Sequence, residues 1–174
     1  MKADRIKYKV IAKQIPTKTS ITCGTENPAS LGCTFYELES GEIAAPFTCG
    51  PLQEGHEGIM HGGITAAILD EAMGRANRIC CRECGEHDVP FFTAEMTVKY
   101  LKPVLSGKKM VAYGRVERID GRKRYTYGEI VDEDGELMAT ATGLYISVKI
   151  ADDNLDYSKI NGGQMLSEED PKEL

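Results

Sequence analysis

One segment of this chain has the apolar periodicity of a long helix. From Gly63 to about Cys80 apolar residues recur at a spacing of three to four. Projected at about 100° per residue, seven of them fall on one broad apolar face: Ile68, Leu69, Ala72, Met73, Ala76, Ile79 and Cys80. A helix with such a face needs a second layer to cover it. The rest of the chain must therefore supply that layer.

The segments on both sides of this helix carry strand patterns. Apolar and polar residues alternate from Phe92 to Tyr100, which predicts a strand. Five further strands are predicted, mostly bounded by short glycine-containing turns, at residues 33–38, 43–48, 110–119, 125–131 and 137–148. Pro46 predicts an edge position for the strand 43–48. Two strands, one helix and four strands in this order predict an α+β domain in which an antiparallel sheet packs against the helix.

The composition predicts one folded domain with two appendages. The chain has 174 residues, of which 41% are hydrophobic, and this suits a single core. Residues 1–20 are mixed and basic and predict an N-terminal arm with at most a short amphipathic helix. Residues 151–174 are acidic and poorly patterned, which predicts a C-terminal tail. The domain is expected over residues 21–150.

Charge and hydropathy limit the classes of partner. The formal net charge of −6 disfavours a nucleic-acid partner. No stretch approaches the roughly 18 apolar residues of a membrane span. The first residues also lack the apolar core of a signal peptide. We therefore expect no membrane partner and a cytoplasmic location.

The cysteines are expected to be reduced thiols, because a chain without an export signal rarely forms disulfides. Four residues near the end of the predicted helix suggest a zinc site as an alternative: Cys80, Cys81, Cys84 and His87. A structural zinc site usually takes two separated pairs of ligands, and the second pair is missing here. We expect no metal and a cysteine-rich surface loop.

Two neighbouring carboxylates on the predicted helix have different surroundings. Glu71 can pair with Arg75 one turn further on. The helical neighbours of Asp70 offer neither a cation nor a side-chain donor; they are Ala66, Ala67, Met73 and Gly74. Such a carboxylate is costly to desolvate unless something outside the helix engages it, and catalytic carboxylates are often found at such sites. The alternative is that Asp70 faces water at the helix margin.

His61, Gly62 and Gly63 lead into the helix. The first N–H groups of a helix have no intrahelical partner and lie at the positive end of its dipole, so they can bind an anion or polarise a carbonyl. Glycine lets a substrate approach this backbone closely. A tight turn would explain the two glycines equally well, and a structural role would explain His61.

Three segments together resemble the hotdog-fold thioesterases of the phenylacetate-pathway (PaaI-like) type. They are the His-Gly-Gly at 61–63 with Asp70 nine positions after His61, the Cys-Gly-x-x-Asn-Pro at 23–28, and the strand sequence at 93–103. The resemblance covers roughly residues 20–148. It implies a hotdog fold, with an antiparallel sheet of about five to six strands wrapped around one central helix. It also implies hydrolysis of an acyl-coenzyme A thioester, with no cofactor because coenzyme A is part of the substrate.

The resemblance also implies roles for individual residues. Asp70 would be the catalytic carboxylate, as nucleophile or general base, the Gly62 N–H would polarise the thioester carbonyl, and Thr93 would orient the reacting groups. His61 is expected in the same catalytic set, with Gly63 beside the substrate. The family often has Asn or Gln six residues before the histidine, where this chain has Gly55. Next to it, His56 or a water is expected to contact the substrate instead.

Arg122, Lys123 and Arg124 lie at a predicted hairpin turn. Arginine forks and lysine charges suit phosphates, so we expect these residues to contact coenzyme A. A solvated turn with no ligand is the alternative.

The spacing of Gly62 and Asp70 predicts a shared site. Eight residues on a continuous helix span about 12 Å, whereas a reacting carbon lies within roughly 3–3.5 Å of the attacking group. One chain therefore cannot supply both roles to one substrate. We predict an obligate homodimer with two interface sites, and leave a dimer of dimers open.

Two other functions remain open. A hotdog protein that binds acyl-coenzyme A without hydrolysing it could act as a sensor. Such regulators are expected to carry a DNA-binding domain, and residues 1–20 are too short for one. A hotdog enoyl-coenzyme A hydratase or dehydratase would place an Asp and a His about five residues apart on the helix, but the predicted helix contains no histidine.

Overall fold

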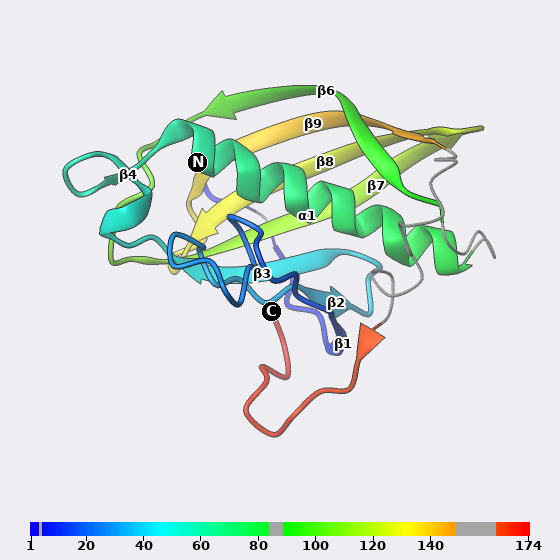
Figure 1. Cartoon of the computed structure of the whole chain (residues 1–174), viewed down its shortest axis with the longest axis horizontal. Coiled ribbons are helices and arrows are strands. Elements are labelled where there is room, and N and C mark those ends of the chain that lie inside the picture. The colour runs from blue at the N-terminus through cyan, green and yellow to red at the C-terminus, as the bar shows by residue number, and fades with distance from the viewer. Residues whose placement is uncertain (4, 84–88, 149–162) are drawn as a thin grey trace.

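The computed structural model describes residues 1–3, 5–83, 89–148 and 163–174. One long helix, α1 (Gly62–Glu83), lies along one face of a large antiparallel sheet (Figure 1). Within the described residues this sheet has eight strands in the order β10-β1-β2-β3-β7-β8-β9-β6. The strands are β1 (Val10–Gln14), β2 (Tyr36–Leu38), β3 (Ile43–Thr48), β6 (Phe91–Tyr100), β7 (Lys109–Asp120), β8 (Lys123–Asp132), β9 (Leu137–Ser147) and β10 (Gly163–Gln164). A short 3₁₀ helix, η1 (Pro51–Gln53), and a separate hairpin, β4 (Glu54–His56) with β5 (Ile59–Met60), precede α1.

The predicted helix and the six predicted strands all occur in the predicted order, with β1, β4, β5 and β10 in addition, and the α+β class is confirmed. The described sheet is larger than the expected five to six strands because both ends of the chain add to it. Residues 10–14 form β1 and pair with β2, so the expectation of at most a short helix in the arm is wrong. No helix in the described ranges combines the length and apolar character needed to cross a membrane.

The position of β3 corrects the edge-strand prediction. β3 pairs with β7 from Ile43 to Thr48 and also pairs with β2, so it lies inside the sheet. On the β2 side, however, the pairing reaches only Ile43 and Ala44. Pro46 lies beyond the end of the three-residue β2, and its missing N–H therefore costs no hydrogen bond on that side.

The core lies between α1 and the sheet. The predicted apolar face of α1 is buried there, except that Cys80 is only half buried. The helix packs very closely on β7: a Cβ at Gly114 would lie 2.4 Å from the carbonyl carbon and oxygen of Ala72. Only glycine permits this approach, and it fixes the height of α1 above the sheet.

A smaller apolar cluster joins both ends of the chain to the sheet. Its buried members include Val10, Tyr36 and Val131, with Tyr8 and Leu174 packed against it. The backbones of Tyr8 and Leu174 exchange hydrogen bonds of 2.9 and 3.1 Å. β10 and the last residues of the chain thus lie beside β1 (Figure 1). Residues 149–162, which include half of the expected tail, lie outside the described residues.

Candidate active site

Asp70 projects from α1 and bonds to two strands of the sheet. The Thr93 hydroxyl on β6 donates to Asp70 Oδ1 at 2.7 Å. The Tyr145 hydroxyl on β9 lies 2.7 Å from the same oxygen and 2.8 Å from the Asp70 carbonyl oxygen. Within the described residues no hydrogen bond reaches Asp70 Oδ2. A carboxylate with one oxygen anchored and the other open can act as a nucleophile or a general base.

A β-bulge brings Thr93 to Asp70. Among the described residues β6 is an edge strand that pairs with β9 alone, and its register shifts between Thr93 and Glu95. Unbroken alternation would place Thr93 on the opposite face from Met96 and Val98, which pack against the core. The extra residue of a bulge moves the following side chains to the other face. Thr93 before the bulge and Met96 after it therefore both face α1.

Sequence reasoning missed Tyr145. It is the cross-strand partner of Thr93 and only 2% exposed. Burial, together with the charge of Asp70 and the bond to it, raises the pKa of the Tyr145 hydroxyl well above its usual range, so this group keeps its proton and donates. A signal was present in the sequence: the inward-facing residues of β9 before it are the small Ala139, Ala141 and Gly143. A large aromatic residue with a polar tip interrupts that series.

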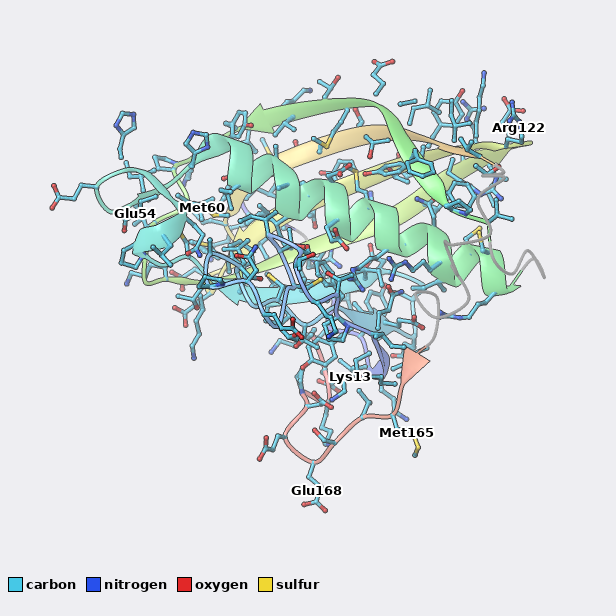
Figure 2. The ribbon with its side chains drawn as sticks, viewed as in Figure 1. Lys13, Glu54, Met60, Arg122, Met165 and Glu168 are labelled. Carbon is cyan, nitrogen blue, oxygen red and sulfur yellow. The ribbon has the colours of Figure 1, made fainter. Side chains whose placement is uncertain are left out.

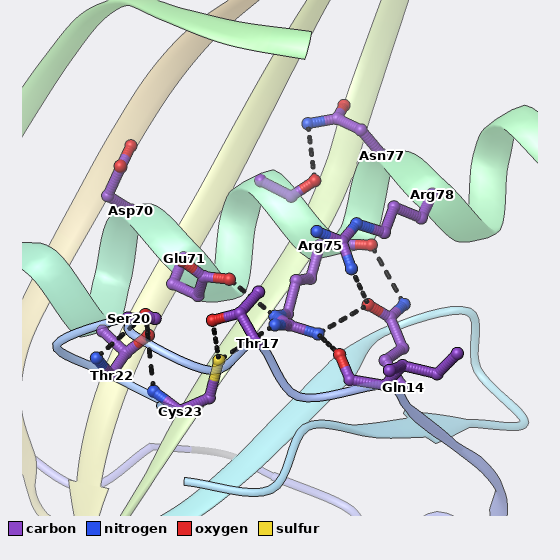
Figure 3. Close-up of polar contacts among 12 residues, drawn as sticks. Gln14, Thr17, Ser20, Thr22, Cys23, Asp70, Glu71, Arg75, Asn77 and Arg78 are labelled. Carbon is purple, nitrogen blue, oxygen red and sulfur yellow. Dashed lines mark hydrogen bonds and ion pairs between the residues drawn. The ribbon is translucent and has the colours of Figure 1, made fainter. Parts of the chain in front are cut away.

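The predicted pair of Glu71 and Arg75 is confirmed. Arg75 Nε donates to Glu71 Oε1 at 2.7 Å. The Arg75 side chain is 1% exposed and also donates to the Ile15 carbonyl at 3.3 Å and the Cys23 thiol at 3.2 Å. Figure 3 shows Asp70 and Glu71 leaving α1 in different directions. Glu71 therefore belongs to a buried network that joins α1 to residues 14–23.

The cysteine of the Cys-Gly-x-x-Asn-Pro segment belongs to this network. Burial alone would raise the pKa of the Cys23 thiol, but hydrogen bonding to Thr17 and the charge of Arg75 outweigh burial and lower that pKa. At the neighbouring Cys33 burial outweighs the charge of Arg75 and raises the pKa of the thiol to about 12. The described cysteines are free thiols, as expected, and no metal-binding cluster is found among the described residues. The zinc alternative stays untested, because Cys84 and His87 lie outside them.

His61 caps the start of α1. Its Nδ1 accepts a hydrogen bond from the Gly63 N–H at 2.9 Å, and its carbonyl accepts from the Thr65 N–H at 3.0 Å. The Tyr100 hydroxyl donates to the Gly62 carbonyl at 3.0 Å. In the described part of the chain the Gly62 N–H donates no hydrogen bond. This N–H is thus open at the positive end of the helix dipole, where it can polarise a carbonyl.

The structure does not bring all of the expected site residues together. Gly62 and Asp70 lie on the same unbroken helix, about 12 Å apart along its axis. His56 is exposed on the β4–β5 hairpin. That hairpin and Arg122 lie at opposite ends of the sheet (Figure 2). One chain therefore presents the expected residues in three separate places.

The three basic residues near the β7–β8 turn differ in exposure. Arg122 and Lys123 are exposed, but Arg124 is buried, only 2% exposed. Its Nη1 donates to the Gly121 carbonyl at 2.7 Å, and its guanidinium lies 5.0 Å from the centroid of the Phe91 ring. Only the first two residues present a cation at the surface of the turn.

A pocket of about 340 Å³ opens beside Asp70, between α1 and the start of β6. Its lining includes Gly74, Arg78, Phe91 and Phe92. Burial, and next the charge of Arg75, lower the pKa of Arg78 to about 10. The pocket therefore combines aromatic surface with two carboxylates, Asp70 and Glu71, and cationic residues.

This chain is similar to several known proteins. A family model described as the thioesterase superfamily matches residues 57–139, which include the helix start, Asp70 and Thr93. The acyl-coenzyme A thioesterase THEM4 of Xenopus laevis is 32% identical over 117 residues, which is 67% of this chain and 50% of that protein. The chain thus spans about half the length of the curated relatives it matches.

Solved structures agree on the fold. The thioesterase superfamily protein RHA08564 is 26% identical, with a TM-score of 0.64 over 73% of this chain and 59% of that one. The PaaI protein from the phenylacetic acid degradation operon of E. coli is 18% identical, with a TM-score of 0.60 over 68% of this chain and 81% of its own. The smu.793 protein of Streptococcus mutans, bound to acetyl-CoA, is 17% identical, with a TM-score of 0.54 over 62% and 82%.

Three observations lead to the same assignment. They are the packing of one long helix against an antiparallel sheet, the family match across the helix and the following strands, and the likeness to these solved structures. This chain matches the thioesterase superfamily across its helix and the strands that follow, and it has the hotdog fold.

Proposed function

We propose that this chain hydrolyses acyl-coenzyme A thioesters to a free acid and coenzyme A. The observation that carries the proposal is the Asp70 carboxylate beside a pocket, with Oδ1 bonded to Thr93 and Tyr145 and Oδ2 open. The substrate class is supported by the name of the THEM4 relatives and by the acetyl-CoA bound to the Streptococcus mutans protein. No cofactor is needed for this reaction.

Two routes are compatible with the geometry. In one, Asp70 attacks the thioester carbon, the C–S bond breaks to release coenzyme A thiolate, and water then cleaves the acyl–carboxylate anhydride. In the other, Asp70 takes a proton from a water that attacks the same carbon. In both routes the Gly62 N–H stabilises the negative charge that develops on the carbonyl oxygen. A hydroxyl-anchored carboxylate serves either route.

We propose that the site is shared by two copies of the chain. The separation of Gly62 and Asp70 along α1 requires that Gly62 of one copy serve Asp70 of the other. The outer edge of β6 supports this assembly, because it leaves ten residues without a neighbouring strand among the described residues. Such edges pair readily with another strand. Exposed apolar side chains on β6, Phe92 and Tyr100, suit burial at a subunit interface.

The same assembly would place the coenzyme A phosphates. If the β6 strands of two copies pair antiparallel, the sheet of the second copy points in the opposite direction to that of the first. The helix start of one copy then lies at the same end as the β7–β8 turn of the other (Figure 2). We therefore retain Arg122 and Lys123 as phosphate contacts and drop the buried Arg124 as a surface contact.

A panel of acyl- and aryl-coenzyme A thioesters tests the proposal. The purified chain is incubated with each thioester, and the released thiol is detected with a chromogenic disulfide. We expect turnover of at least one thioester. An intact fold with no thiol release above the uncatalysed rate across the panel would contradict the proposed activity.

A further inference from the structure

We infer that Tyr145 is a positioning residue for Asp70: together with Thr93 it fixes Oδ1 and so leaves Oδ2 as the oxygen that reacts. The inference rests on the proposed hydrolytic function and adds to it. It names the reacting atom and a residue 75 positions away in the sequence that orients it.

The hydrogen bonds assign different tasks to the two carboxylate oxygens. The Tyr145 hydroxyl has one proton and two acceptors within reach, Asp70 Oδ1 at 2.7 Å and the Asp70 carbonyl at 2.8 Å. A charged carboxylate oxygen is the stronger acceptor, so the proton points to Oδ1. Thr93 donates to the same oxygen at 2.7 Å. Oδ1 is thus held by two donors from two strands, whereas Oδ2 receives none from the described residues.

The space around the Tyr145 ring holds the hydroxyl in place. A Cβ at Gly143 would lie 2.8 Å from Tyr145 Cε2, closer than side-chain carbons approach. A Cβ at Gly74 on α1 would lie 3.5 Å from Tyr145 Cε1, which is ordinary contact. The ring therefore fills a slot between α1 and β9 that the glycine at 143 leaves open. A ring packed on both edges cannot swing its hydroxyl away from Asp70.

A fixed carboxylate matters more for the chemical step than for binding. Orientation of the attacking group lowers the activation barrier, and small displacements of that group are costly. A hydrogen bond to a charged group contributes enough to change a rate by about 10- to 100-fold. Loss of the Tyr145 hydroxyl should therefore lower kcat and leave KM nearly unchanged.

The test is the Tyr145→Phe variant, which keeps the ring and removes only the donor. We expect kcat to fall about 10- to 100-fold with KM within about twofold of the unmodified chain. The loss should fall on kcat and not on KM, because the reacting group is less well oriented while the pocket is unchanged. A residue that only filled the core would change the free energy of unfolding without such a selective loss of kcat.

Tyr127→Phe is the matched control. The Tyr127 hydroxyl on β8 also donates to a carboxylate, that of Glu129 at 3.2 Å, but it does not contact Asp70. This variant should keep the kcat and the KM of the unmodified chain. A second variant, Gly143→Ala, displaces the Tyr145 ring without changing its hydroxyl and should also lower kcat with KM nearly unchanged.

The outcomes separate this inference from the proposed function. Wild-type kcat in Tyr145→Phe, alongside an inactive Asp70→Asn, would overturn the positioning role and leave hydrolysis standing. If Tyr145→Phe does not fold, a wild-type kcat in folded Gly143→Ala overturns the role. Absence of turnover in the unmodified chain would overturn the proposed function, and this inference with it.

Discussion

The carboxylates of Asp70 and Glu71 are adjacent in the sequence but bond to different parts of the fold. Asp70 is held by hydroxyls of β6 and β9, and Glu71 by the buried guanidinium of Arg75. Both carboxylates line the pocket, but Asp70 is oriented by hydroxyls, whereas Glu71 pairs with the arginine that joins α1 to residues 14–23. This division predicts that the two residues respond differently to neutralisation.

Asp70→Asn should lower hydrolysis of acyl-coenzyme A at least about 100-fold, because an amide neither attacks the carbonyl nor accepts a proton from water. The side chain keeps its size and one acceptor for Thr93, so the fold should survive. Thiol release measures the activity, and circular dichroism with size-exclusion chromatography checks the fold. Near-normal turnover would show that Asp70 does not have the proposed role.

Glu71→Gln should leave kcat nearly unchanged but lower stability. The variant replaces the charged partner of Arg75, whose side chain is 1% exposed, and leaves a buried cation poorly compensated. We expect a loss of about 1–3 kcal/mol in the free energy of unfolding, measured with urea. A large loss of activity in a folded Glu71→Gln variant would mean that the catalytic carboxylate has been misassigned.

Thr93→Val should lower kcat, and Thr93→Ser should largely restore it. Valine has the shape of threonine without the hydroxyl that donates to Asp70 Oδ1 at 2.7 Å, while serine keeps the donor. The expected loss for valine is about tenfold, since Tyr145 still holds the same oxygen. Steady-state kinetics measures kcat for both variants. A valine variant that turns over as fast as the serine variant would contradict the role of the hydroxyl.

Gly114→Ala should destabilise the fold by at least about 2 kcal/mol, because the new Cβ would lie 2.4 Å from backbone atoms of Ala72. Gly74→Ala is the matched comparison, since its Cβ would meet only Tyr145 at 3.5 Å and alanine favours helices. Urea unfolding should show a lower free energy of unfolding for Gly114→Ala and an unchanged or higher one for Gly74→Ala. Similar stabilities for both variants would contradict the close contact of α1 with β7.

The sequence patterns predicted most of the secondary structure but only part of the candidate site. Periodicity alone identified the helix and the strand that became β6, and the absence of a helical partner drew attention to Asp70. Periodicity could not reveal the bulge after Thr93. This bulge is defined by the pairing of β6 with β9, which the pattern of one strand does not show.

Contacts between distant segments explain the other misses. Tyr145 reaches Asp70 across 75 residues, and β1 is a strand only because β2 and β10 pair with it. Arg124 looked like part of a solvated turn, yet its register opposite Tyr145 places it on an inward-facing position of β8. Register and long-range pairing depend on the whole sheet, which local patterns do not encode.

Subunit complementation tests whether two chains share each site. Gly62→Pro removes the backbone N–H at the first position of α1, where proline is tolerated, and a Cβ there meets only Tyr100 at 3.6 Å or more. Gly62→Pro and Asp70→Asn should each be inactive as pure dimers. A heterodimer of the two keeps one intact site, formed by the unmodified glycine of one copy and the unmodified aspartate of the other. Random exchange of equal amounts should therefore recover about one quarter of wild-type activity. Verified subunit exchange with no recovery would place both groups of a working site on one chain, and would contradict the shared site.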